Sequence, residues 1–99
     1  MIARIWNGKV DASHYESYAA FLNQVAIPDY EKTAGLTGLV FLRNKDERYA
    51  RFKLITYWEN IEAIRNFAGS DYKKAKYYPE DKNFLLYFEE EAEHYEVFS

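Results

Sequence analysis

Apolar and polar residues alternate along four stretches of this chain, and helical spacing replaces the alternation in two regions between them. The alternation predicts strands over residues 2–9, 36–43, 48–58 and 84–98, with a break in the last one at its run of glutamates. The polar sequence NKDE separates the second and third of these stretches, so a hairpin turn is expected there.

The first helical region follows a possible capping box formed by Ser13 and Glu16. Its apolar residues recur at helical spacing and define one face: Tyr15, Tyr18, Ala19, Leu22, Val25 and Ala26. Pro28 lacks a backbone donor and crowds the preceding turn, so it is expected to end or kink this helix. Gly35 would stop any short turn that follows.

The second helical region begins behind Asn60, a residue suited to cap a helix. Its apolar stripe consists of Ile61, Ile64, Phe67 and Ala68. Gly69 and Ser70 interrupt the pattern, and a shorter helical piece is expected over residues 71–78 before Pro79 stops it.

This order of elements, βαββαβ, predicts one domain spanning residues 1–99. The expected fold is an α+β, ferredoxin-like sandwich, with two helices on one face of a four-stranded antiparallel sheet. The length of the chain is enough for one hydrophobic core and not for two.

The face that the helices leave free is expected to be apolar as well. Ile5 and Trp6 point to opposite faces of the first strand, and Val40 and Phe41 do so in the second. In the third strand, Phe52, Leu54 and Trp58 oppose Ile55 and Tyr57. An exposed patch of this kind usually marks a partner surface, and the simplest partner is a second copy of the chain in a symmetric homodimer.

Composition and charge narrow the possible functions. Aromatic residues make up 19% of the chain, which suits a cavity or an interface. The net charge is −3 and acids dominate the C-terminal region, so a nucleic-acid partner is disfavoured. Nothing in the chain resembles a membrane span or a secretory signal. The absence of cysteine excludes disulfides and thiolate metal sites, and it favours a cytoplasmic location.

The sequence ITYWENIEAIRNFAGSDYKKA, a strand followed by Trp-Glu and a helix, resembles the antibiotic-biosynthesis monooxygenase family of dimeric α/β-barrel proteins. The resemblance covers nearly the whole chain, and the C-terminal YYPEDKNFLLYFEEEAEHYEVF resembles a branch without an assigned activity. It implies a homodimer with a cavity between helices and sheet in each subunit. Some members of the family oxidise polycyclic phenols or quinols with molecular oxygen and no cofactor, and another branch binds and degrades haem.

The chain departs from the family at several functional positions. Two histidines that members often carry correspond here to Phe67 and Tyr72. Asn7 and Trp58 match an asparagine and a tryptophan of the haem-degrading branch, but its histidine ligand corresponds to Tyr77. Tyrosine can ligate haem iron, so haem remains an outside alternative.

Three residues are candidates for catalysis: His94, Asn7 and Trp58. His94 titrates near neutral pH and can accept a phenolic proton, or it can be a structural residue bonded to a neighbour. Asn7 can polarise a substrate carbonyl, or it can belong to a turn beside Gly8. Trp58 can stack on a planar substrate, or it can be a core residue.

Four further residues are candidates for substrate binding: Phe67, Tyr72, Tyr77 and Arg65. The tyrosines can instead be packing residues, and Arg65 can be solvated. The glutamates of EEEAE alternate between faces, so no metal site is expected there. The leading hypothesis is cofactor-independent oxygenation of a small planar phenol or quinol, with His94 as the base. The alternatives are a non-catalytic dimer that binds a small molecule or only assembles, and a haem protein.

Overall fold

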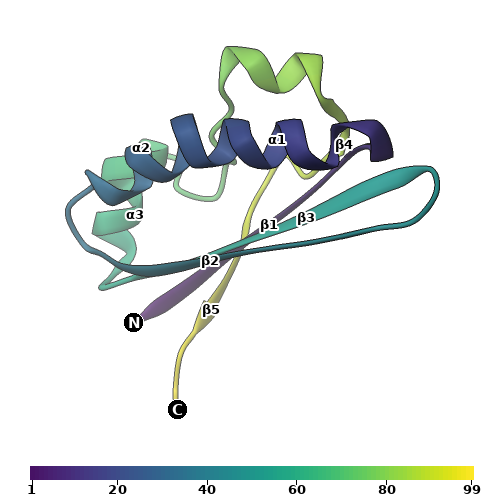
Figure 1. Cartoon of the computed structure of the whole chain (residues 1–99). Coiled ribbons are helices and arrows are strands. Elements are labelled where there is room, and N and C mark those ends of the chain that lie inside the picture. The colour runs from purple at the N-terminus through teal and green to yellow at the C-terminus, as the bar shows by residue number, and fades with distance from the viewer.

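The sheet is built around strand β1 (Ile2–Asp11) in a computed structural model that describes all 99 residues (Figure 1). On one side, β1 pairs with β3 (Tyr49–Trp58), and β3 pairs with β2 (Leu36–Lys45). On the other side, β1 pairs with β4 (Leu85–Phe88) and with β5 (Glu93–Glu96). All pairs are antiparallel, and the order β2-β3-β1-β4 confirms the predicted ferredoxin-like arrangement.

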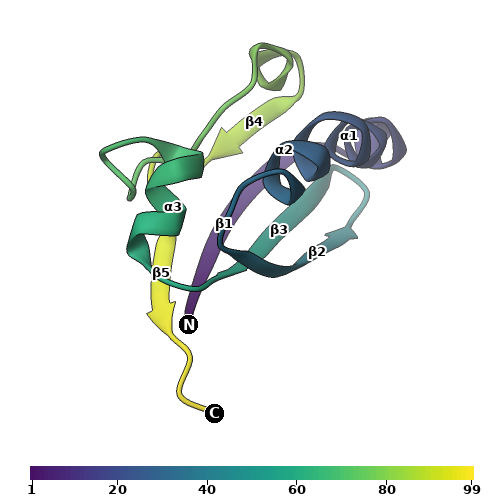
Figure 2. The same ribbon diagram turned by 90° about the vertical axis from the view of Figure 1, so that its left-hand side faces the viewer.

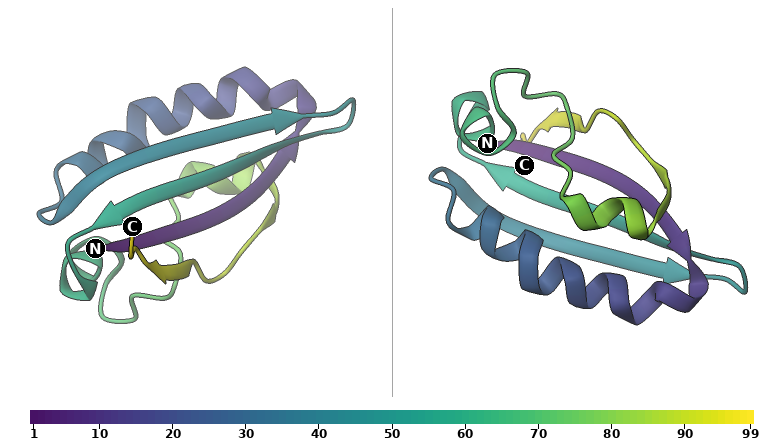
Figure 3. Two further views of the ribbon diagram at one scale, coloured as in Figure 1. Left: turned by 90° about the horizontal axis from the view of Figure 1, so that it is seen from below. Right: turned by 90° about the horizontal axis from the view of Figure 1, so that it is seen from above.

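The helices cover one face of this sheet and leave the other face free (Figure 3). The first helical region contains α1 (Tyr15–Phe21), a π-helical stretch (Leu22–Ala26) and α2 (Ile27–Glu31). The second is α3 (Ile61–Ala68), where the side chain of Asn60 accepts a hydrogen bond from the Ala63 amide at 2.9 Å, as its capping role predicts. None of these helices is long and apolar enough to cross a bilayer.

The start and middle of the first helical region differ in detail from the prediction. Asp11, rather than Ser13, caps its opening 3₁₀ turn (Ala12–His14), and no capping box forms between Ser13 and Glu16. Pro28 does not end the helix. The π-helical stretch lies immediately before it, and such a widened turn relieves the clash between the proline ring and the preceding carbonyls.

The predicted helical piece over residues 71–78 is wrong. The backbone there is extended in part, because Ala75 donates to the Glu90 carbonyl at 3.0 Å and Ala92 donates to the Lys73 carbonyl at 2.8 Å. The only helical turn in this region is a 3₁₀ helix that starts at the proline, Pro79–Asn83. Pairing with residues 90–92 satisfies backbone groups that would otherwise bond within a helix.

The expected break in the last strand is confirmed, so the sheet has five strands instead of four. At the break, the carboxylate of Glu89 accepts the Asn7 amide hydrogen at 2.9 Å. The chain then leaves β1 to pair with residues 73–75 before it returns as β5.

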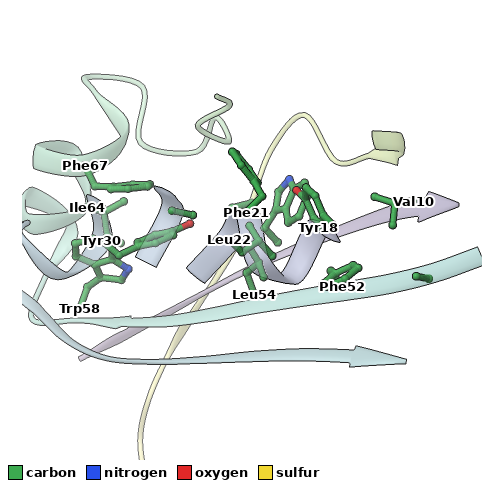
Figure 4. Close-up of a cluster of buried hydrophobic side chains, with 14 of the residues drawn as sticks. Val10, Tyr18, Phe21, Leu22, Tyr30, Phe52, Leu54, Trp58, Ile64 and Phe67 are labelled. Carbon is green, nitrogen blue, oxygen red and sulfur yellow. The ribbon is translucent and has the colours of Figure 1, made fainter. Parts of the chain in front are cut away.

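The core lies between the sheet and the helices (Figure 4). At one end Trp58, Tyr30 and Phe67 pack together, and the Tyr30 and Phe67 rings are stacked with centroids 4.2 Å apart. At the other end Tyr18 packs edge-on against Phe52 at 4.9 Å. Trp58 is completely buried.

The helix-free face is apolar at one end, which confirms that large apolar residues occupy both faces. Ile5, Ile55 and Val40 form one row across β1, β3 and β2, and Ala3 and Tyr57 belong to the next row. Val40 is 44% exposed and Ile5 and Ile55 are half-buried, so this row is open to solvent in the single chain.

Candidate functional site

A small cavity lies between the sheet and the helices, where the family resemblance placed a ligand site. Its volume is about 30 Å³, which is room for no more than a water molecule or two. Residues 69–84 connect α3 to β4 (Figure 2). Five of them line one side of the cavity and so close it: Ala75, Lys76, Tyr77, Tyr78 and Asp81. The wall is mostly aromatic and aliphatic, with these polar or charged members: Arg4, Tyr18, Tyr30, Lys76, Tyr77, Tyr78 and Asp81.

Arg4 is the most unusual residue of this wall. It lies on the helix-covered face of β1 and is only 4% exposed, yet no carboxylate pairs with it. Its guanidinium donates instead to the carbonyls of Tyr72 and Lys74 and contacts Nε2 of His94 at 3.0 Å. Burial lowers the pKa of Arg4, but an arginine keeps its proton in proteins. The cavity wall therefore contains a buried positive charge without a counter-ion.

His94 contacts the guanidinium of Arg4 and does not line the cavity. It lies opposite Arg4 in the register of β1 and β5, and its ring packs edge-on against Tyr72 with centroids 5.1 Å apart. Burial, together with the positive charges of Arg4 and Lys73, lowers the pKa of His94 to about 4. The imidazole is therefore neutral at pH 7, and its Nε2 accepts a hydrogen bond from Arg4.

This low pKa predicts that the protein loses stability as the pH falls from about 6.5 towards 4. An unfolded histidine takes up a proton near pH 6.5, whereas the native His94 resists protonation until about pH 4. Between these values the unfolded state binds more protons, so acid favours unfolding. In His94→Gln, whose amide oxygen can still accept from Arg4, urea-unfolding free energies should depend less on pH across this window. Equal slopes for wild type and variant would show that His94 does not titrate in this way.

The hydroxyl of Tyr30 makes no hydrogen bond with any other protein group, although the residue is only 8% exposed and lines the cavity. Burial raises its pKa to about 12, and the charge of Arg4 opposes that rise. No buried side-chain nitrogen or oxygen of the chain lacks a partner, so the Tyr30 hydroxyl oxygen itself keeps some contact with solvent. Tyr30 therefore offers a donor and an acceptor to whatever enters the cavity.

Asp81 is the only carboxylate in the cavity wall. Its two oxygens accept hydrogen bonds from the Tyr18 hydroxyl at 3.0 Å and from the Tyr78 amide at 2.8 Å. Burial raises the pKa of Asp81, and the two hydrogen bonds oppose the rise. A buried carboxylate with a raised pKa is suited to take up and release a proton.

The fourth polar feature of the wall is the hydrogen-bonded pair of Trp6 and Tyr77. The indole nitrogen of Trp6 donates to the Tyr77 hydroxyl at 3.1 Å, and that hydroxyl donates to the Glu89 carbonyl. The Trp6 ring lies over Gly8, where an added Cβ would come within 2.2 Å of it. Glycine is therefore needed at position 8 for Trp6 to occupy this part of the wall.

Asp29 of α2 forms hydrogen bonds with residues 69–84, the segment that closes the cavity. Its carboxylate accepts hydrogen bonds from Lys76 and from the Tyr78 hydroxyl, both at 2.6 Å. Asp29 belongs to α2, and Lys76 and Tyr78 belong to the closing segment, so these bonds join the two sides of the cavity. Backbone pairing of residues 73–75 with residues 90–92 and the hydrogen bonds of Arg4, Trp6 and Tyr18 also hold this segment, which contains no helix or named strand before Pro79.

The structure places the sequence-predicted site residues in separate environments. Trp58 and Phe67 belong to the core, where the Trp58 indole donates to the Thr56 hydroxyl at 2.8 Å. Arg65 lies over the Tyr72 ring at 5.4 Å and pairs with Glu62 at the surface.

Of the seven site residues predicted from the sequence, only Tyr77 lines the cavity. Asn7 lies on the helix-free face, in register with Lys53, and its amide donates to Glu89 at 3.0 Å. His94 reaches the cavity only through Arg4. Asn7 and His94 therefore do not converge on one ligand.

Arg4, Tyr30 and Asp81 were missed as site residues. For Arg4 a signal existed, because strict alternation puts it on the same face as Ile2 and Trp6, and a charge on such a face is unusual. No comparable signal marked Tyr30 or Asp81, since their positions depend on how the closing segment folds.

The residues of the cavity do not fit haem. The available volume is far too small for a porphyrin, and the Tyr77 hydroxyl, the expected ligand, is already bonded to Trp6 and Glu89.

Comparisons with known proteins give structural neighbours only. No family model and no curated protein matches the sequence. The crystal structure of PA3566 from Pseudomonas aeruginosa aligns with a TM-score of 0.68 at 13% identity, over 99% of this chain and 94% of that one. A Bacillus cereus protein named "Putative Antibiotic Biosynthesis Monooxygenase" aligns with a TM-score of 0.58 at 17% identity, over 100% and 93% of the two chains. At these identities, the likeness shows that this chain has the ferredoxin-like fold of those two proteins.

Proposed function

We propose that this protein is a homodimer that oxygenates a small planar phenol or quinol without a cofactor, in the cavity between sheet and helices. The observation that carries the proposal is that one cavity wall contains both the buried charge of Arg4 and the unpartnered hydroxyl of Tyr30. The fold shared with a protein named as an antibiotic-biosynthesis monooxygenase supports the reaction class.

Arg4 is suited to stabilise an anionic form of the substrate. A buried cation without a counter-ion is costly, and a phenolate bound next to it would offset that cost. Electrostatic stabilisation of developing charge is strong in a site that excludes water. Tyr30 would add a hydrogen bond to the same oxygen, and the aromatic wall would contact the ring.

We assign the base to Asp81 rather than to His94. Asp81 lies in the cavity wall and has a raised pKa, whereas the Nε2 lone pair of His94 is already used by Arg4. In this role His94 is a positioning residue, because it helps to fix the guanidinium of Arg4.

The reaction balances without a further reductant. Asp81 removes a proton from the substrate, and the resulting anion is held by Arg4. The anion gives its electrons to molecular oxygen and forms a carbon–oxygen bond, and a proton returns to give a hydroperoxide. Loss of water from the hydroperoxide breaks the oxygen–oxygen bond and leaves a carbonyl, so an anthrone becomes an anthraquinone. One oxygen atom enters the product and the other leaves as water.

A substrate of this size requires the closing segment to move. Opening would break the bonds of Asp29 to Lys76 and Tyr78, which are individually worth about 1 kcal/mol or somewhat more. Such a movement is comparable to the loop motions that admit substrate in many enzymes.

Oxygen uptake tests the assignment of the base. With an anthrone or a quinol as substrate, Asp81→Asn is expected to lower the rate about a hundredfold or more, since general base catalysis contributes that much. Asparagine can keep both hydrogen bonds. Its side-chain oxygen can accept from the Tyr78 amide, and its side-chain nitrogen can donate to the Tyr18 hydroxyl oxygen. Lys82→Gln changes the exposed neighbour and is the matched control.

Two results would contradict this assignment. If Asp81→Asn retains the wild-type rate while His94→Ala loses it, His94 is the base. If no substrate of this class consumes oxygen with the wild type, the proposed reaction is wrong.

A non-catalytic dimer that binds a small molecule is the second candidate. The absence of histidine at Phe67 and Tyr72, where members of the resembled family often carry one, favours it. Binding of a phenol that perturbs the NMR signals of Tyr30 and Arg4 without any oxygen uptake would identify this function.

A further inference from the structure

The helix-free face carries a second cleft that the proposed reaction does not use. It has a volume of about 470 Å³, within the range of small-molecule sites. Lys9, Arg51 and Lys53 line it, together with Asn44 and Tyr87. In the strand register, its residues lie beyond the apolar row of Ile5, Ile55 and Val40, towards the β2–β3 turn. This turn projects from one end of the sheet in Figure 3.

The positive charges that line this cleft repel one another, which lowers the stability of the fold. Lys9 and Arg51 are directly opposite each other in the register of β1 and β3, and like charges in that position repel. Lys53 lies two residues further along β3 on the same face. Arg51 pairs with Asp46 at 2.8 Å, but no acidic residue lines the cleft. The chain as a whole has a charge of −3, so this cationic group is a local feature.

An aromatic ring and a free amide complete the cleft. Tyr87 of β4 is 54% exposed, and Nζ of Lys9 lies 5.9 Å from the centre of its ring. The side chain of Asn44 makes no hydrogen bond and is exposed beside Arg51. A flat surface next to three cations suits a ligand that has both a ring and a negative group.

We propose that this cleft binds a small organic anion in which a phosphate or carboxylate is attached to a planar ring. Lys9, Arg51 and Lys53 contact the anionic group, and Tyr87 packs against the ring. The site is separate from the inner cavity, so it does not depend on the proposed oxygenase reaction.

Phenyl phosphate is the probe that tests the proposal. In calorimetric titrations of the wild-type protein at constant ionic strength, it is expected to bind more tightly than inorganic phosphate or phenol, because only it has both parts. Lys53→Gln and Lys9→Gln are each expected to weaken binding about tenfold, the usual effect of losing one charge-assisted hydrogen bond. Lys82→Gln removes an exposed lysine elsewhere and should leave the affinity unchanged.

NMR titration locates the site independently of its strength, and the expected shifts are at Lys9, Lys53 and Tyr87. The proposal is overturned if phenyl phosphate at millimolar concentration produces neither heat nor these shifts, or if all three lysine variants bind it equally well. It is also overturned if the Lys9 and Lys53 variants weaken only self-association, because the acidic C-terminal region of a second copy, residues 89–96, would then be the occupant. Binding of all anions in proportion to charge alone would exclude the role of Tyr87.

Discussion

Ile55→Asp is expected to convert the protein from a dimer into a folded monomer. Ile55 lies in the middle of the helix-free face, between Ile5 on β1 and Val40 on β2, and all three side chains are at least partly open to solvent. In the proposed dimer this row is covered by a second copy. An unpaired carboxylate buried there would weaken association about a hundredfold or more. In the monomer the same carboxylate remains in water, so the fold should persist.

Light scattering after gel filtration at micromolar concentration measures this effect. The wild type should have twice the mass of a single 11.8 kDa chain, and Ile55→Asp should have the mass of one chain. Gln24→Asp adds the same charge at an exposed helical position on the opposite face and should remain dimeric. A wild type that is monomeric under these conditions would exclude the dimer.

Trp58→Ala is expected to cause the largest loss of stability of any single substitution considered. Trp58 is completely buried, its rings contact Tyr30 and Phe67, and its indole nitrogen donates to Thr56. Removing such a side chain leaves a cavity and costs about 3–5 kcal/mol. Small domains have free energies of unfolding of about 5–15 kcal/mol, so a large part of the stability would be lost.

Urea unfolding followed by circular dichroism measures this loss. Trp58→Phe keeps most of the packing and should retain most of the stability, which makes it the matched variant. The two hypotheses for Trp58 then separate clearly. If Trp58→Phe is as stable as the wild type but no longer binds or oxidises a phenol, Trp58 contacts substrate. If its substrate affinity is unchanged, Trp58 is a core residue only.

The pattern of the sequence was sufficient for most of the fold because that pattern is local. Alternation in β1 and β3 reports which side chains share a face, and it correctly put Ile5 opposite Trp6 and Ile55 opposite Trp58. The Asn60 cap and the spacing of the α3 stripe depend on residues within two turns. The glutamate run correctly indicated the break in the last strand.

The site was less predictable because its residues come from segments that meet only in the folded chain. Asn7 was chosen from a family resemblance, yet alternation already puts it on the face of Ile5 and away from the inner cavity. His94 is near the cavity, but only the structure shows that Arg4 occupies its nitrogen and that its pKa is lowered to about 4. The bond comes from a residue ninety positions away in the sequence, and the lowered pKa comes first from burial and then from the positive charge of that same residue.

The sequence by itself determined the elements, their order and the apolar character of both sheet faces, because side-chain periodicity follows directly from backbone geometry. Only the tertiary structure decided the path of residues 71–78, of which residues 73–75 pair with residues 90–92 and none form the expected helix. That path supplies the carbonyls that hold Arg4 and brings Asp81 to Tyr18. Whether a buried charge has a partner depends on every segment around it, and no local pattern contains that information.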